Sequence, residues 1–406
     1  MKIFFTLVLF IGLISLASAQ RQCGTTDYKR SQPPVLLQSP QKSSVTRDTI
    51  ANEVINIPVV IHVLYNADEE NISDEQIQSQ LTALNQDFSK QNYNIANIPP
   101  VFAKLAGDVK INFTLSVTDP KGNTTKAIIR KHTSVLHWEA NDEMKFSATG
   151  GDNGWDANNY LNIWVCNLSG RSLGYASLPG TELSKDGIVI QYTAFGTNGT
   201  AKAPFNKGRT LTHETGHWLG LMHIWGDDNC GDDKIGDTPP QQGYNNGCPS
   251  FPHLSSCSAN ADGDMFMNFM DFTNDDCMSM FTNGQKNKMR SLFAKGGSRN
   301  SLLVSPGGKP ATGETAPAVT AETTISETAL SFYPNPAKEK ITFINRSGED
   351  FKSQSIHIYN TLGRQIMATE FTAESPSVTV NTLSPGIYII KVGAGKNATT
   401  LKLVKN

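Results

Sequence analysis

The sequence predicts two folded units: an α/β or α+β domain with a mixed twisted sheet, followed by a small β-sandwich. The first unit is indicated by strand, helix, strand and helix patterns that follow one another between residues 57 and 222. The second is indicated by short β-type runs separated by turn residues from 328 to 406. A chain of 406 residues is also too long for one ordinary hydrophobic core.

The elements of the first unit are predicted in chain order. An apolar run over 57–64 fits a buried strand, and a helix follows in which Ser73 and Gln76 form a capping box. Apolar residues that alternate from Ile111 to Val117 predict a half-buried strand. Two further runs, 160–166 and 187–192, predict two more strands, and a helix is predicted over 209–222.

The composition changes near residue 294. The stretch 296–327 is rich in Gly, Pro, Ala, Thr, Ser and Glu, which predicts an extended linker between a domain over 48–295 and one over 328–406. Six short β-type runs follow the linker, and they begin at Leu330, Ile341, Ser355, Ser377, Ile387 and Thr399.

The first residues have the form of a targeting segment. Lys2 precedes an apolar stretch over 3–16, and small residues at 17–19 fit a cleavage site, so 1–19 is predicted to be a secretory signal peptide rather than a buried helix. Residues 20–47 are polar and without periodicity, which indicates a pro-segment or a flexible lead-in. No long apolar run remains after cleavage, so no transmembrane segment is expected in the mature protein.

The charge of the chain is balanced, with 35 basic and 37 acidic side chains. This balance gives no net positive electrostatic field that would attract nucleic acid, and nucleic-acid binding is therefore disfavoured. Export implies an oxidising compartment, in which the six cysteines of the chain can pair.

The motif that carries chemistry is His213-Glu-Thr-Gly-His217-Trp-Leu-Gly220-Leu-Met-His223. Two histidines four residues apart lie on one face of a helix and can hold one metal ion, and Glu214 between them can polarise a water molecule. Gly220 permits a sharp turn, so that His223 can return as a third ligand. Three protein ligands with one open position are what a catalytic zinc requires.

The plain alternative for this motif is a surface helix with solvated histidines. That alternative does not explain why three of the eight histidines in the chain fall within eleven residues. Of the remaining histidines, His62 is predicted to be a satisfied core residue, and His253 in the cysteine-rich loop is a weaker candidate for a substrate cleft. The run of Met and Phe over 265–272 would by itself be core, but its place after the zinc motif suggests a Met-turn beneath the metal.

Together these segments resemble the pappalysin family of metzincins, in particular its compact bacterial members. The resemblance spans roughly 50–295. It rests on Trp155-Asp156, Tyr160-Leu-Asn-Ile-Trp-Val-Cys166, Leu173-Gly-Tyr-Ala176, Gly208-Arg-Thr-Leu-Thr-His-Glu214, His223-Ile-Trp-Gly226, Asp237-Thr-Pro-Pro240, Asn268-Phe-Met-Asp-Phe272 and Met280-Phe-Thr-Asn-Gly-Gln285.

This resemblance implies a metzincin fold with two main helices above a zinc cleft and an irregular lower half after Gly220. It implies a secreted zinc-dependent endopeptidase that prefers sites next to Arg or Lys, with Glu214 as catalytic base and Met270 as the Met-turn residue. It also implies structural calcium in the loops after the third histidine, where Asp237 and Thr238 lie. Protein or peptide substrates are the expected partners.

The resemblance also suggests roles for the cysteines. Two bridges in the lower half are expected, Cys230–Cys257 and Cys248–Cys277, out of three pairings that four cysteines allow; a zinc site of four cysteines is disfavoured because the sequence lacks CxxC pairs. Cys23 is expected to block the zinc as a cysteine switch, with a free or mispaired terminal thiol as the alternative.

Cys166 is predicted to be an inert buried thiol, and removal of the pro-segment is expected near Arg47-Asp48. One departure from the family is Phe272, which stands where related enzymes commonly have a tyrosine. The alternative function is therefore a weakly active or inactive scaffold that serves as a surface-binding protein. A metal-dependent amidase that acts on small molecules is a third hypothesis.

The last unit resembles the sorting domain of the type IX secretion route. The resemblance rests on Phe332-Tyr-Pro-Asn-Pro336, Ile358-Tyr-Asn-Thr-Leu-Gly-Arg364, Leu383-Ser-Pro-Gly-Ile-Tyr-Ile-Ile-Lys-Val392 and Lys402-Leu-Val-Lys405. It implies contact with the secretion machinery and an extracellular or cell-surface location. The alternative is a generic adhesive β-sandwich.

Overall fold

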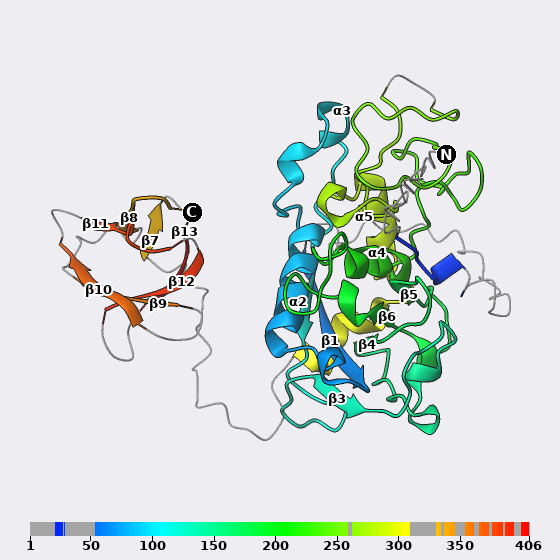
Figure 1. Ribbon diagram of the computed structural model, residues 1–406, viewed down its shortest axis with the longest axis horizontal. Coiled ribbons are helices and arrows are strands. Elements are labelled where there is room, and N and C mark those ends of the chain that lie inside the picture. Colours follow the sequence, from blue (N-terminus) through cyan, green and yellow to red (C-terminus); the bar gives the residue numbers. More distant parts are fainter. Residues whose placement is uncertain are drawn as a thin grey trace, which may run out of the picture. The chain divides into compact units, whose positions relative to one another are not determined.

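In the computed structural model the chain divides into two compact units, 1–314 and 315–406, which are described separately below (Figure 1). The structure describes residues 21–26, 28, 53–258, 262–308, 330–333, 337–345, 354–360, 365–372, 376–384, 386–393 and 399–405. The expected signal peptide (1–19), residues 29–47 of the expected pro-segment with the cleavage point near Arg47, and residues 309–327 of the expected linker lie outside the described residues.

A six-stranded mixed sheet forms the centre of the first unit. Its strands are β1 (Ile55–Tyr65), β2 (Ile111–Leu115), β3 (Ile128–His132), β4 (Leu161–Cys166), β5 (Gly174–Ala176) and β6 (Ile188–Gln191). The order is β2-β1-β4-β6-β5, and β3 also pairs with β1. All of these pairs are parallel except β5 with β6, so β5 is an antiparallel strand at the edge of the sheet.

The central strands are apolar along their whole length because both faces of the sheet are covered. Every residue of β4 is buried, and β1 is buried from Ile57 to Leu64. Such continuous burial is typical of parallel strands between two layers. The mixed sheet expected from the sequence is therefore present.

Helices α2 (Asp74–Phe88), α4 (Arg209–Trp218) and α5 (Asn283–Ser291) pack against this sheet. The short helix α3 (Pro100–Ala103) lies apart from it, in a separate core cluster that contains Phe102. Apolar residues of α2, α4 and α5 share one core cluster with β1, β4 and β6. Figure 1 shows α2, α4 and α5 gathered beside the strands.

The start of α2 differs from the expected capping box. The Ser73 side chain does accept a hydrogen bond from the backbone N–H of Gln76. The side chain of Gln76, however, is buried and donates to the carbonyl oxygens of Tyr192 and Phe195 instead of returning to the helix start. Tertiary hydrogen bonds of the Gln76 side chain have thus replaced the second hydrogen bond of the capping box.

The part of the first unit that follows α4 contains little regular structure. From Leu219 to the N-cap of α5 at Thr282, one short 3₁₀ helix over Asp275–Cys277 is the regular element among the described residues. Disulfides Cys230–Cys257 and Cys248–Cys277 close loops across 27 and 29 positions of this region. Each bridge of such length stabilises a fold by about 3 kcal/mol.

The first unit extends further along the chain than the sequence predicts. Residues 300–304 and 306–308 form 3₁₀ helices, Leu302 joins the main core, and Arg299 makes a buried ion pair with Asp186. Gly307 packs closely against Tyr160. The expected linker therefore does not begin at Gly296, because this Gly-rich stretch also carries the apolar and charged anchors that hold it to the sheet.

The second unit consists of two antiparallel sheets with a common core. One has the order β10-β9-β12-β13 and the other β11-β8-β7. The strands are β7 (Leu330–Tyr333), β8 (Lys340–Asn345), β9 (Gln354–Asn360), β10 (Gln365–Phe371), β11 (Ser377–Thr379), β12 (Gly386–Val392) and β13 (Thr399–Lys405). Six of them match the β-type runs of the sequence. β10 was not predicted, because it is an edge strand with mostly exposed side chains and no apolar alternation.

Candidate metal centre

Helix α4 carries the first half of the motif. All ten of its residues are buried, and His213 and His217 lie on the same face, with their rings 4.8 Å apart. Gly216 lies between them for a steric reason, since a Cβ there would collide with Sδ of Met270. The expected Met-turn methionine therefore packs directly against the helix at Gly216.

The chain reverses directly after this helix. The helix ends at Trp218, earlier than the predicted end at Met222, because Gly220 adopts a φ of +83°, which favours glycine. This turn returns His223 to the first two histidines. The Nε2 atom of His217 lies 3.2 Å from that of His213 and 3.1 Å from that of His223.

The opposite nitrogen of each ring is held by an acceptor. Nδ1 of His213 contacts the carbonyl oxygen of Phe269 at 2.7 Å, and that of His217 contacts the carbonyl oxygen of Leu221 at 2.9 Å. Nδ1 of His223 contacts the carboxylate of Asp227. With a proton on each Nδ1, the three Nε2 lone pairs converge on one point.

This arrangement fits a tetrahedral zinc. Two nitrogens bound at roughly 2.0–2.1 Å would lie about 3.3 Å apart, close to the separations found here. Burial and the neighbouring imidazoles lower the pKa of His213 well below its usual value, which favours the neutral ring that a metal requires. Within the described ranges, Cys23, His213, His217 and His223 are the one group of three or more His, Cys, Asp or Glu residues whose ligand atoms all lie within 4.8 Å of one another.

Cys23 reaches this group from a segment that lies along the free edge of β5. The backbone N–H of Gly24 donates to the carbonyl of Gly174 at 2.8 Å, and that of Leu173 donates to Gln22 at 2.9 Å. Burial and the negative charge of Glu214 raise the pKa of the Cys23 thiol well above its usual value. A cation shared with the histidines would reverse this effect and favour the thiolate.

Glu214 faces the same site. Its carboxylate accepts a hydrogen bond of 2.8 Å from the hydroxyl of Thr25, and burial raises its pKa to about 7. A carboxyl group with such a pKa can both accept and donate a proton near neutral pH.

The turn at Met270 is held by side-chain hydrogen bonds. The carboxamides of Asn268 and Gln285 bond each other, at 2.9 and 3.0 Å, and Asn268 Oδ1 accepts the backbone N–H of Met270 at 2.9 Å. The ring of Phe272 stands edge-on to His223, 4.8 Å between centroids. Phe272 therefore forms an apolar wall beside the third histidine and offers no hydroxyl there.

The comparisons with known proteins agree with this geometry. The profile of the peptidase M43 family described as pregnancy-associated plasma protein-A matches residues 148–294. An extracellular metalloprotease of Arthroderma benhamiae is 30% identical over 296 residues, which cover 70% of this chain and 94% of the relative. The chain belongs to the pappalysin family of metalloproteases.

Solved structures support the same assignment of this pappalysin. Mature mirolysin of Tannerella forsythia, solved with a cleaved peptide, is 51% identical with a TM-score of 0.61, and covers 62% of this chain and 96% of its own. A promirolysin variant of the same organism is 50% identical with a TM-score of 0.62, and covers 63% of this chain and 86% of its own. The metzincin fold and the metalloprotease class expected from the sequence are confirmed.

The pappalysin is a secreted protein. A profile described as a secretion system C-terminal sorting domain matches residues 331–406, and the relatives include extracellular metalloproteases. In the part of the chain that the structure describes, no helix has the length and apolar character needed to cross a membrane.

A buried arginine pocket of this pappalysin was not predicted from the sequence. The guanidinium of Arg21 forms an ion pair with Asp275, donates to Thr210 Oγ1 at 3.1 Å and lies 5.0 Å from the ring centroid of Phe205. The exposed fraction of Arg21 is 2%. Asp275 lies five residues after Met270, and an acid so buried is rare without a partner. Asp227, which contacts His223, was missed as well.

The residues expected at a calcium site have other contacts. Both carboxylate oxygens of Asp237 accept hydrogen bonds at the start of α5, from the Thr282 hydroxyl at 2.7 Å and the Gly284 N–H at 2.8 Å. The hydroxyl of Thr238 donates to Asp233 at 2.7 Å. Burial raises the pKa of Asp233 to about 6, and its Oδ2 is buried without a hydrogen-bond partner among the described residues.

The remaining histidines lie outside the metal group. His62 is buried, with Nδ1 2.6 Å from Asp152 Oδ2 and Nε2 3.1 Å from Asn162 Oδ1, as the prediction of a satisfied core residue requires. The ring of His253 packs edge-on against Phe266 in the disulfide-closed region. Cys166 is buried in β4, as expected of an inert thiol.

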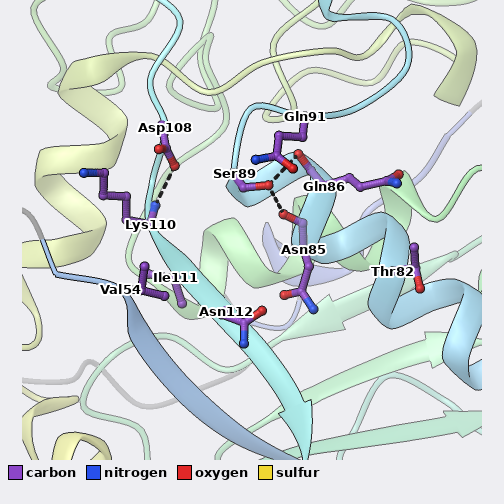
Figure 2. Close-up of a pocket in the computed structure, with 10 residues that line it drawn as sticks. All are labelled: Val54, Thr82, Asn85, Gln86, Ser89, Gln91, Asp108, Lys110, Ile111 and Asn112. Carbon is purple, nitrogen blue, oxygen red and sulfur yellow. Dashed lines mark hydrogen bonds between the residues drawn. The ribbon is translucent and has the colours of Figure 1, made fainter. Parts of the chain in front are cut away.

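A separate hollow lies between the end of α2 and the edge strand β2, with a volume of about 540 Å³ (Figure 2). Most of its lining residues are of polar types, and none is a histidine or cysteine. Among them is Asp108, whose carboxylate accepts the backbone N–H of Lys110 at 3.1 Å. These residues do not form a group of metal ligands, so the histidine group remains the candidate site.

Proposed function

We propose that this pappalysin is a zinc-dependent endopeptidase that cuts peptide chains next to arginine or lysine. The observation that carries the proposal is that the segment 21–25 binds like a peptide across three converging histidines, with Arg21 on Asp275 and Thr25 on Glu214. The cleaved peptide in the mirolysin structure supports the same reading for this chain.

In this proposal His213, His217 and His223 hold the metal through Nε2. Zinc supplies Lewis acidity, which activates water and polarises a carbonyl. Glu214 accepts the proton of the attacking water and then delivers it to the leaving amine, a role for which a pKa near 7 is suited. Met270 supports the ligands from below, and Phe272 keeps the space beside His223 free of water.

The preference for basic residues follows from the Asp275 pocket. Asp275 is fully buried, and its second oxygen accepts the backbone N–H of Lys207 at 2.7 Å, so the carboxylate is fixed in place. Once Arg21 leaves, a basic side chain of a substrate would restore the lost ion pair. The pocket therefore selects for a cation at one position beside the cleavage site.

We also propose the remaining organisation from the sequence. Residues 1–19 direct export, 20–47 are removed as a pro-segment, 48–295 with its extension to 308 form the catalytic domain, and the sorting domain contacts the secretion machinery. The promirolysin structure is consistent with such a proform. Calcium is proposed for the loop around Asp233, whose free carboxylate oxygen makes it a better ligand than Asp237.

Cys23 is proposed to keep the unprocessed chain inactive. Replacing Cys23 with Ser in the full chain removes the thiolate ligand and should raise its activity on a reporter peptide by at least about tenfold, equivalent to 1.4 kcal/mol. The Cys166→Ser chain is the matched control, because its thiol is buried in β4 away from the metal group. Equal activity of the Cys23→Ser and wild-type chains would exclude the switch.

The decisive measurement is cleavage of a mixed peptide library by the processed protein, with and without a zinc chelator, read by mass spectrometry. We expect cuts next to Arg or Lys that disappear with the chelator and return when zinc is added. Absence of cuts in a sample that holds one zinc and lacks residues 20–47 would favour the surface-binding scaffold, with Phe272 as its cause.

A further inference from the structure

Besides the metal group, the segment before the catalytic domain fills a second recess. The exposed fraction of Tyr28 is 2%, and its ring centroid lies 4.9 Å from that of Tyr175 on β5. Its hydroxyl donates to Asp142 Oδ2 at 2.7 Å. Tyr175 packs with Trp164 and Met144 in a core cluster separate from the one that contains α4. The recess therefore lies apart from the histidines.

The walls of this recess hold an unusual cation. Lys145 is completely buried, and its ammonium group contacts Asp142 Oδ1 at 2.7 Å and the carbonyl oxygen of Lys185 at 2.6 Å. It lies 5.5 Å from the ring centroid of Trp164 and 5.1 Å from that of Tyr175. Lys145 also lies 5.5 Å from the ring centroid of Tyr28. Its contacts with Asp142, the Lys185 carbonyl oxygen and the other two rings are made without Tyr28, so the recess remains built when Tyr28 leaves.

One short segment connects this recess to the active centre. After Cys23 and Thr25 have contacted the metal group and Glu214, the backbone N–H of Tyr28 closes a helical turn on the carbonyl of Gly24 at 2.8 Å. Arg21, Cys23 and Tyr28 thus occupy three places in order: the Asp275 pocket, the histidines and the recess.

We infer that the recess formed by Asp142, Lys145, Trp164 and Tyr175 is a tyrosine-binding exosite, a site for a peptide side chain away from the reacting bond. In the unprocessed chain it retains the pro-segment through Tyr28, and after processing it binds tyrosine-bearing peptides. This inference rests on the proposed function, because the recess opens only when the pro-segment leaves.

The chemistry of the recess selects tyrosine among side chains. A phenol fills the space between the rings and donates to Asp142 Oδ2, as Tyr28 does. Phenylalanine would leave that buried oxygen without this donor. A charged side chain would lose its hydration in this buried site and gain no free counter-charge, because Asp142 and Lys145 already pair with each other.

The retaining role is tested by the reactivity of Cys23 in the full chain. We expect Tyr28→Phe to raise the rate of Cys23 alkylation by iodoacetamide about tenfold, since a hydrogen bond to a charged group is lost. Cys166, the other unpaired cysteine and a buried one, reports unfolding in the same sample and should stay unreactive. Tyr93→Phe, which removes a surface hydrogen bond to Asp276, is the matched control.

The binding role is tested by filling an emptied recess. In the full chain with Tyr28→Gly, p-cresol (the tyrosine side chain) should bind about tenfold more tightly than toluene, measured as the ligand-dependent rise in Tm. Equal binding of the two probes would overturn the inference, and so would an unchanged Cys23 rate in Tyr28→Phe. Neither measurement requires peptide hydrolysis. If both gave the expected result and the processed protein cut no peptide, the proposed protease function would be wrong and the exosite would stand.

Discussion

Replacing Glu214 with Gln in the processed protein is expected to lower kcat for peptide cleavage by about 10²–10⁴-fold, the usual contribution of a general acid–base group. Glutamine preserves the shape of the side chain and an acceptor oxygen, but it cannot take the proton of the attacking water. The zinc content should stay at one per chain, because the converging ligand atoms belong to histidines. Stopped assays on an arginine-containing peptide, together with atomic spectroscopy, measure both quantities.

The control for this substitution is Glu139→Gln, an exposed carboxyl group of the same unit. It should leave kcat and metal content unchanged. If Glu214→Gln retained full activity with bound zinc, another group would have to act as the base. If it lost zinc as well, the residue would instead serve the metal site.

Replacing Asp275 with Asn is expected to reduce kcat/KM for peptides with a basic residue at the cleavage site by about 10²-fold relative to the same peptides with leucine there. The reason is the loss of a buried carboxylate from a pocket that holds an arginine in this structure. A charge-assisted hydrogen bond contributes roughly 1.5–3 kcal/mol, and the basic side chain would remain unpaired in the pocket. The ratio of the two kcat/KM values is the readout.

The neighbouring Asp276 provides the matched control, because it is exposed and bonds the hydroxyl of Tyr93 at the surface. Asp276→Asn should leave the ratio unchanged. A similar fall for basic and leucine peptides in Asp275→Asn would mean that Asp275 supports the fold, through Lys207 and Arg209, rather than the preference.

The sequence was sufficient for features that depend on local spacing. The strand β1, the helix α4 and the turn at Gly220 follow from apolar periodicity and from the conformational freedom of glycine, which act within a few residues. The motif of three histidines fixes its own geometry, because a helical turn and one reversal bring the rings together. These features were predicted at their observed places, apart from the earlier end of α4.

Contacts between residues that lie far apart in the chain could not be predicted from the sequence. Arg21 and Asp275 are 254 residues apart, and neither has a local pattern that marks it as buried. The same holds for Arg299 and Asp186. Their ion pair helps to extend the first unit beyond Gly296, where the sequence predicts the start of the linker. Gln76 fits a local capping box, yet buried carbonyl groups compete for its side chain and prevail. In each case a long-range contact outweighs a local preference.

The edge position of β5 has a consequence for the secreted chain before it is processed. An unpaired strand edge can form backbone hydrogen bonds with another extended chain, and such pairing between protein molecules leads to aggregation. Here the backbone of 22–24 already occupies that edge through Gly174 and Leu173. The segment beside the histidines therefore also covers this strand edge, and in its absence the edge would be free to pair with the extended backbone of a substrate.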